Sequence, residues 1–123
     1  MAQHNELGKE GELLARKYLA GKRYKILQTN WKLGNIEVDI IAQIKKTIVF
    51  VEVKTRSSEV FQLPEQAVDL HRQRRLTMAA DSFMKQFSDK YEARFDIIAV
   101  VQENGKTEIR HTIDAFCPVP KYY

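Results

Sequence analysis

Two consecutive strand-like runs that are apolar on both faces constrain the fold of this 123-residue chain more than any other feature. The runs span residues 36–43 and 47–54 and are joined by a short connection at Lys45 and Lys46. Side chains of a strand alternate between its two faces, so a run without polar alternation is typical of a central strand covered on both sides. The sequence therefore predicts a hairpin of two central strands, with helices covering both faces of their sheet.

A helix and a further strand are predicted ahead of this hairpin. Apolar or small residues recur at helical spacing over about residues 5–22 and form one stripe. The members of this stripe are Leu7, Gly11, Leu14, Ala15, Tyr18 and Leu19. A strand over residues 24–31 then leads into the hairpin.

The second half of the chain contains a second helix and a second hairpin. Pro64 predicts the beginning of a long helix that reaches about residue 87. Its periodic positions include Ala67, Leu70, Arg74 and Met78. A strand over residues 94–101 follows, and Asn104-Gly105 predicts a turn into a last strand over residues 107–112. The order α-β-β-β-α-β-β predicts an α/β fold with a central mixed β-sheet flanked by helices.

Length and composition restrict the class of protein. Residues 1–123 are expected to form a single domain, and 44% apolar with 29% charged residues argues against disorder or a fibrous architecture. No stretch approaches the about 20 apolar residues of a membrane span, and the N-terminus lacks the apolar core of a secretory signal. We therefore expect a cytoplasmic protein without a membrane partner. Its net charge of +4 suits a polyanionic partner such as nucleic acid.

Four charged residues interrupt the two central strands, and burying a charge without compensation costs several kcal/mol. Glu52 and Lys54 share one face of their strand at a separation of roughly 7 Å. Glu37 and Asp39 likewise share a face of the neighbouring strand. If the strands pair as a hairpin, Asp39 converges with Glu52 and Lys54 near the strand ends. The result is a compact acidic pocket with one cation.

Such a pocket suits Mg²⁺ or Mn²⁺, because two carboxylates and a backbone carbonyl leave room for water and phosphate oxygens. Asp39, Glu52 and the carbonyl of Val53 are the expected ligands. Glu12 lies at the edge of the buried stripe of the first helix, and we expect it to complete the outer shell of the metal. Lys54 would orient the attacking water or stabilise charge on phosphorus. The sequence thus predicts phosphodiester hydrolysis, with Asp39, Glu52 and Lys54 as catalytic residues.

A structural interpretation exists for most of these residues. Glu-x-Lys in a strand is commonly a solvated or salt-bridged face, and a glutamate at a helix edge commonly pairs with a neighbouring Arg or Lys. The position of Glu37 fits either a solvent-side residue or one that supports the metal ligands.

Basic residues near the predicted pocket suit contacts with backbone phosphates. Arg56 follows the Glu52/Lys54 pair, and Arg72 and Arg75 belong to a basic cluster of the second helix. A solvated helix face is the alternative for the helical arginines. Gln66 is expected to donate or accept a hydrogen bond near the site.

Motifs along nearly the whole chain resemble one known family. The motifs are Gly11-Glu12, Ile36-Glu37-Val38-Asp39-Ile40-Ile41-Ala42, Val49-Phe50-Val51-Glu52-Val53-Lys54-Thr55-Arg56 and Arg94-Phe95-Asp96-Ile97-Ile98. They look like those of the YraN family of small bacterial proteins. That family is similar to the restriction-endonuclease-like superfamily and, within it, to archaeal Holliday junction resolvases. The resemblance implies a restriction-endonuclease-like fold and Mg²⁺-dependent DNA cleavage, with Glu12, Asp39, Glu52 and Lys54 at the metal and catalytic positions.

Two functions from different classes remain open at this point. The first is an endonuclease that acts on branched or structured DNA, as a homodimer because cutting two strands symmetrically favours two related sites. The second is a non-catalytic nucleic-acid-binding or adaptor protein that retains a nuclease fold. The intact carboxylates and lysine favour the first, although a fold by itself decides neither.

Overall fold

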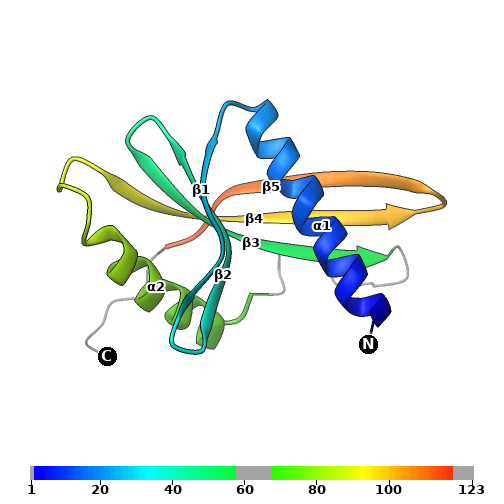
Figure 1. Cartoon of the computed structure of the whole chain (residues 1–123), viewed down its shortest axis with the longest axis horizontal. Coiled ribbons are helices and arrows are strands. Elements are labelled where there is room, and N and C mark those ends of the chain that lie inside the picture. Colours follow the sequence, from blue (N-terminus) through cyan, green and yellow to red (C-terminus); the bar gives the residue numbers. More distant parts are fainter. Residues whose placement is uncertain (1, 58–67, 118–123) are drawn as a thin grey trace.

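Five strands form one sheet with two helices packed against it (Figure 1). The structure is a computed structural model that describes residues 2–57 and 68–117. The elements are α1 (Ala2–Gly21), β1 (Lys25–Leu33), β2 (Ile36–Ile44), β3 (Thr47–Ser57), α2 (Leu70–Met84), β4 (Glu92–Glu103) and β5 (Lys106–Phe116). The predicted α/β class, mixed sheet and order α-β-β-β-α-β-β are confirmed. Within the described ranges, neither helix combines the length and apolar character needed to cross a membrane.

The strands lie in the order β1-β2-β3-β4-β5, and the β3–β4 pair is the parallel one. A parallel pair needs a crossover connection, and the segment that contains α2 provides it. Both predicted hairpin turns are confirmed. Lys45 lies in the β2–β3 turn with a φ of 54°, and Asn104 and Gly105 have φ values of 51° and 76°. Positive φ at both central residues matches the twist of antiparallel strands, which explains the Asn-Gly sequence.

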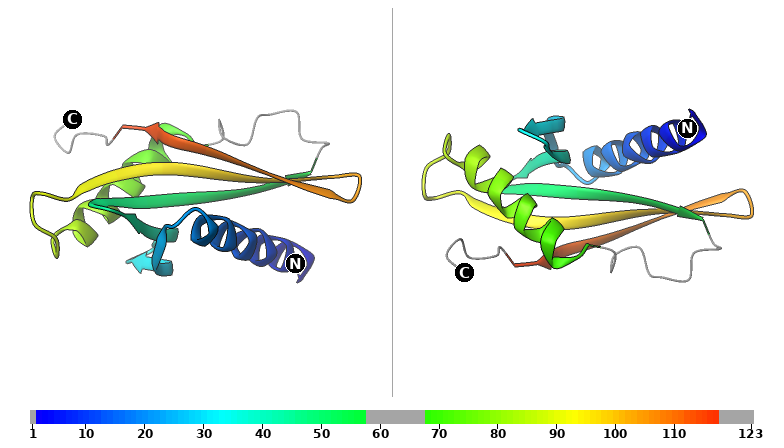
Figure 2. Two further views of the ribbon diagram at one scale, coloured as in Figure 1. Left: turned by 90° about the horizontal axis from the view of Figure 1, so that it is seen from above. Right: turned by 90° about the horizontal axis from the view of Figure 1, so that it is seen from below.

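The two faces of the sheet bury separate apolar clusters, with α1 over one face and α2 over the other (Figure 2). Ala15 and Leu19 of α1 pack against one face, whereas Leu76 and Phe83 of α2 pack against the opposite face. In β3, which lies between the two helices, every residue of the segment 48–51 is at most 2% exposed. The prediction of central strands covered on both sides is therefore confirmed.

The predicted bounds of the second helix were wrong. Val68 and Asp69 are not helical, and α2 begins at Leu70 and ends at Met84 rather than running from Pro64 to Phe87. Asp69 is the N-cap residue, because its side chain accepts a hydrogen bond of 2.8 Å from the backbone N–H of Arg72. Pro64 itself lies outside the described residues.

Of the periodic positions predicted for this helix, Ala67 lies outside the described residues and the others do not form its buried face. Leu70 and Met78 are 53% and 57% exposed, and Arg74 between them is exposed as well. The face that packs on the sheet is a different one, and positions 76, 79, 80 and 83 on it follow the regular helical spacing i, i+3, i+4 and i+7. Its buried members are Leu76, Thr77, Ala79, Ala80 and Phe83. The alanines let the helix approach the strands closely. The prediction chose the wrong face because Leu70 and Met78 also lie at helical spacing, although they are exposed.

The position of α1 depends on a close contact between Gly11 and Thr55 of β3. A Cβ atom at Gly11 would collide with Thr55 Oγ1 and would lie 3.3 Å from Thr55 Cβ. We expect Gly11→Ala to lower the free energy of unfolding by about 1–3 kcal/mol, as overpacking of a close interface does. Urea denaturation measures this change.

Gly8 provides the matched control for this substitution, because a Cβ atom there would meet nothing within 4 Å. Gly8→Ala should be neutral or stabilise by up to about 1 kcal/mol through helix propensity alone. Adding Thr55→Ala to Gly11→Ala should recover much of the lost stability. Equal stability of the two glycine variants would contradict the close contact.

A buried polar network connects α1, β4 and β5. Asp96 on β4 is fully buried and accepts hydrogen bonds from Arg94 Nε and Nη2 at 2.9 and 2.8 Å. His111 Nε2 lies 2.7 Å from Asp96 Oδ2, and the other ring nitrogen lies 3.2 Å from the hydroxyl of Tyr18. The backbone N–H of Asp114 donates to Asp96 Oδ1 from an irregularity of β5, where Asp114 has a φ of 57°. These donors lower the pKa of Asp96 against the effect of its burial.

Candidate active site

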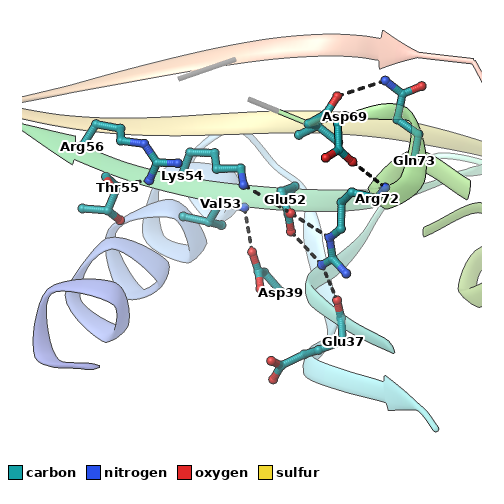
Figure 3. Close-up of polar contacts among 11 residues, drawn as sticks. Glu37, Asp39, Glu52, Val53, Lys54, Thr55, Arg56, Asp69, Arg72 and Gln73 are labelled. Carbon is teal, nitrogen blue, oxygen red and sulfur yellow. Dashed lines mark hydrogen bonds and ion pairs between the residues drawn. The ribbon is translucent and has the colours of Figure 1, made fainter. Parts of the chain in front are cut away.

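Asp39 lies where β2 and β3 stop pairing. The paired register of these strands extends to Ile40↔Val51, so Asp39 is the first residue of β2 beyond it. There the backbone N–H of Val53 donates a hydrogen bond of 2.8 Å to Asp39 Oδ2 (Figure 3). A carboxylate thus connects the two strands at the point where their backbone ladder ends.

Glu52 is buried beside Asp39, and an arginine of α2 donates hydrogen bonds to its carboxylate. Its side chain is 7% exposed, and Arg72 Nε and Nη2 donate to its two carboxylate oxygens at 3.0 and 3.1 Å. Arg72 Nη2 also donates to the backbone carbonyl of Glu37 at 2.6 Å, while the Glu37 carboxylate points away from the guanidinium (Figure 3). The guanidinium therefore joins α2 to both central strands of the predicted hairpin.

The negative charge of Glu52 affects the ionisation of Asp39. The pKa of Asp39 is raised from 3.8 to about 8, first by burial and then by the negative charge of Glu52. A hydrogen bond with Glu52 and the charge of Glu12 raise this pKa further, whereas the Val53 N–H opposes the shift. The raised pKa therefore favours the protonated form of Asp39 at neutral pH.

Lys54 lies on the same side of β3 as Glu52. Its Nζ is 3.7 Å from Glu52 Oε2, and its side chain is 20% exposed. The structure thus brings Asp39, Glu52 and Lys54 together, as the alternation along β3 and the hairpin pairing require. Lys54 can still reach solvent, which leaves its charge available to an incoming anion.

Glu12 faces the same region from α1. Its Oε1 accepts a hydrogen bond of 2.8 Å from the side chain of Asn30, whose backbone is left-handed with a φ of 50°. Burial raises the pKa of Glu12, and the charges of Glu37 and Glu52 raise it further. The charge of the buried Glu52 carboxylate therefore reaches Glu12, whose side chain accepts its hydrogen bond from Asn30 of β1.

The three arginines expected to contact phosphates are placed differently from one another. Arg56 Nη1 donates to the carbonyl of the adjacent Thr55 at 2.9 Å. Arg75 Nη2 donates to the carbonyl and side chain of Asn35 at 3.2 and 2.9 Å. Arg72 instead contacts Glu52, an interaction that the sequence did not indicate. Gln66, expected near the site, lies outside the described residues.

The donor set can be compared with the needs of a divalent cation. Across residues 8–57 and 68–117 of the described chain, no three His, Cys, Asp or Glu side chains are grouped so as to hold a metal ion. Mg²⁺ is, however, commonly bound by one or two carboxylates together with water and phosphate oxygens. Asp39 and Glu52 form such a pair, and their mutual repulsion favours a cation. The residues fit a two-carboxylate site in which Arg72 already contacts Glu52.

Two positioning contacts were missed from the sequence. Asn30 holds Glu12, and Arg72 holds Glu52, in each case from a different secondary-structure element. Asp69, three residues before Arg72, was the available signal for the second contact. As an N-cap it places Arg72 in the first turn of α2, next to the strand ends.

Comparison with known proteins supports one family assignment. Residues 11–100 match the model of the uncharacterised protein family UPF0102. A UPF0102 protein of Bacteroides thetaiotaomicron is 49% identical over 118 residues, which cover 96% of this chain and 98% of that protein. UPF0102 proteins of Phocaeicola vulgatus and Flavobacterium psychrophilum are 42% and 45% identical, with coverage of 96% and 94% of this chain and 98% of each relative. The chain therefore belongs to the UPF0102 family, the YraN-like family that its motifs resemble.

Proposed function

We propose that this protein is a metal-dependent endonuclease that hydrolyses phosphodiester bonds of DNA. The observation that supports this function most is the Asp39–Glu52 pair, in which burial and mutual repulsion raise the pKa of Asp39 to about 8. Carboxylates perturbed in this way by a specific partner cluster at functional sites. Lys54, 3.7 Å from Glu52, adds the cation that phosphate chemistry needs.

The residues of the site would have two roles, which are metal binding and stabilisation of negative charge on the phosphoryl group. Asp39 and Glu52 would hold Mg²⁺ or Mn²⁺, with the Val53 carbonyl and Glu12 as additional oxygen donors. Bound there, the ion would supply Lewis-acid polarisation of the scissile phosphate. Lys54 would stabilise negative charge that develops on the phosphoryl oxygens. The Glu37 carbonyl would support the site by anchoring Arg72, as it does here.

DNA is the proposed partner. The net charge of +4 favours a polyanion, and Arg56 and Arg75 would contact its backbone. The likeness of the YraN family to junction resolvases favours branched DNA as substrate and a homodimer as the active form. We place this activity in the cytoplasm.

A second candidate, a non-catalytic nucleic-acid-binding or adaptor protein, is favoured by one contact. Arg72 engages both oxygens of Glu52, so the buried carboxylate has a cationic partner without any metal. Such a pair can have a purely structural role, because removing one partner of a buried ion pair destabilises the fold.

Cleavage of branched DNA by the purified protein tests the proposed function. The wild-type protein should nick a branched duplex with Mg²⁺ or Mn²⁺ and should lose this activity in EDTA. Asp39→Asn should lower the rate at least about 100-fold, because polarisation by a metal is worth several kcal/mol of transition-state stabilisation. Circular dichroism should show that the variant keeps its fold.

Asp89→Asn is the matched control, since it makes the same substitution at an exposed position after α2. Its rate should equal that of the wild-type protein. A contaminating nuclease would survive Asp39→Asn. If the wild-type protein cuts no linear, branched, single-stranded or RNA substrate with either metal, yet binds DNA, the adaptor function replaces the nuclease function.

A further inference from the structure

The Arg72 guanidinium occupies the position from which a cation would neutralise Glu52. Its Nε and Nη2 each contact a different oxygen of the carboxylate, at 3.0 and 3.1 Å. Its side chain is 28% exposed, whereas that of Glu52 is 7% exposed. This two-point contact is the strong form of an arginine–carboxylate pair, because the planar fork of the guanidinium matches the carboxylate.

A third hydrogen bond fixes the guanidinium in place. Nη2 donates to the Glu37 carbonyl at 2.6 Å, so Arg72 is anchored to β2 as well as to β3. The Asp69 cap on the Arg72 backbone N–H orders the same residue at the beginning of α2. Lysine could not reproduce these contacts, since an ammonium is a point charge without a fixed fork.

A divalent ion bound to Glu52 would share a carboxylate that Arg72 already contacts at both oxygens. Both oxygens of Glu52 accept from Arg72, and Oε2 also lies near Lys54 Nζ. Metal ions and guanidinium groups both seek carboxylate lone pairs, and two cations on one small carboxylate repel each other. Coordination of a metal by Glu52 would therefore weaken the contact with Arg72, and a strong contact with Arg72 would weaken metal binding.

We propose that Arg72 is the resident counter-cation of Glu52 and competes with a divalent cation for that carboxylate, so that the site accepts metal when the guanidinium is released. This regulatory role rests on the metal site of the proposed function. Because Arg72 also holds the Glu37 carbonyl, metal binding is coupled to the contact between the first turn of α2 and β2. Such coupling is reciprocal, so strengthening either contact weakens the other.

Mn²⁺ affinity, measured from the free-ion signal in electron paramagnetic resonance, tests the competition without any measurement of cleavage. Arg72→Gln should bind Mn²⁺ about tenfold tighter than the wild-type protein, within the usual range of coupling between competing sites. Arg75→Gln removes the same charge one turn later on α2, where the arginine contacts Asn35 instead of a carboxylate. It should tighten Mn²⁺ binding by less than about threefold, because this arginine contacts no carboxylate of the site and salt screens charges at a distance.

Arg72→Lys keeps the positive charge but loses the planar guanidinium. It is the alternative variant if Arg72→Gln does not fold. It should bind Mn²⁺ tighter than the wild-type protein but weaker than Arg72→Gln. Equal affinities of the wild-type protein and Arg72→Lys, or equal changes in Arg72→Gln and Arg75→Gln, would overturn the proposal. Binding that survives Asp39→Asn would place the ion elsewhere and overturn both the competition and the metal site.

The competition and the nuclease activity fail in different measurements. Tighter Mn²⁺ binding by Arg72→Gln without cleavage by any variant would support the competition and reject the nuclease. Cleavage by the wild-type protein with unchanged Mn²⁺ affinity in Arg72→Gln would support the nuclease activity and reject the competition.

Discussion

Between about pH 5 and about pH 9 the wild-type protein is expected to lose on the order of 3 kcal/mol of unfolding free energy as Asp39 ionises. Its pKa is raised from 3.8 to about 8 in the folded state, first by burial and next by Glu52. The folded protein keeps this proton over a range in which the unfolded chain has released it. The stabilisation from Asp39 is therefore fully present below about pH 4 and is lost as the pH rises through about 8.

Asp39→Asn should remove most of this pH dependence. The amide oxygen can accept from the Val53 N–H, and the amide nitrogen can donate to Glu52, so asparagine imitates the protonated carboxyl group. Urea unfolding at a series of pH values measures the effect as the difference between wild type and variant, which cancels the other titrating groups.

At about pH 9 the variant should be the more stable protein by a few kcal/mol, and the two should converge towards about pH 4. Mg²⁺ should stabilise the wild-type protein at the higher pH more than the variant. Parallel stability curves for the two proteins would show that Asp39 ionises normally, and the electrostatic argument for a cation site would fail.

The architecture of the sheet was predictable because its signals are local. The segments around Ile40 and Phe50 are apolar on both faces, and this pattern can be read without knowing their partners in the fold. Asn104-Gly105 specifies its turn through the backbone conformation of these two residues. The second helix was harder. Its contact with the sheet uses Ala79 and Ala80, which sequence periodicity weights less than the exposed Leu70 and Met78.

The candidate site was predictable where strand geometry decides it. Glu52 and Lys54 share a face because they are two residues apart, and hairpin pairing brings Asp39 beside them. Arg72 could not be assigned to Glu52 in this way, because 20 residues and a crossover separate them. Such a contact depends on where α2 begins, and that point was predicted incorrectly.

Asp96 shows the same limit for a buried polar group. In the sequence it lies within a strand between Phe95 and Ile97, and nothing nearby identifies all its partners. His111 and Asp114 reach it from β5, 15 and 18 residues later. Part of this contact depends on the irregularity in β5 that turns the Asp114 N–H toward the carboxylate, a feature of backbone geometry rather than of residue type.

Asp96→Ala is expected to destabilise the protein by about 3–5 kcal/mol, the usual cost of removing one partner from a buried ion pair. The substitution removes the fully buried acceptor that the Arg94 guanidinium and the His111 ring share, and it leaves the 6% exposed His111 side chain without it. Asp96→Asn should cost less, because its amide oxygen can still accept hydrogen bonds. Urea unfolding at neutral pH measures both variants.

Glu108→Ala is the matched control, because Glu108 pairs with Arg110 on the same hairpin while being 61% exposed. Removing an exposed pair should change stability by at most about 1 kcal/mol. The low pKa of Asp96 adds a second signature. Its stabilisation is present above the ordinary value of 3.8 and is lost as the pH falls through the lowered pKa, so the difference between wild type and Asp96→Asn should shrink in acid. If Asp96→Ala were as mild as Glu108→Ala, the network would not hold β4, β5 and α1 together.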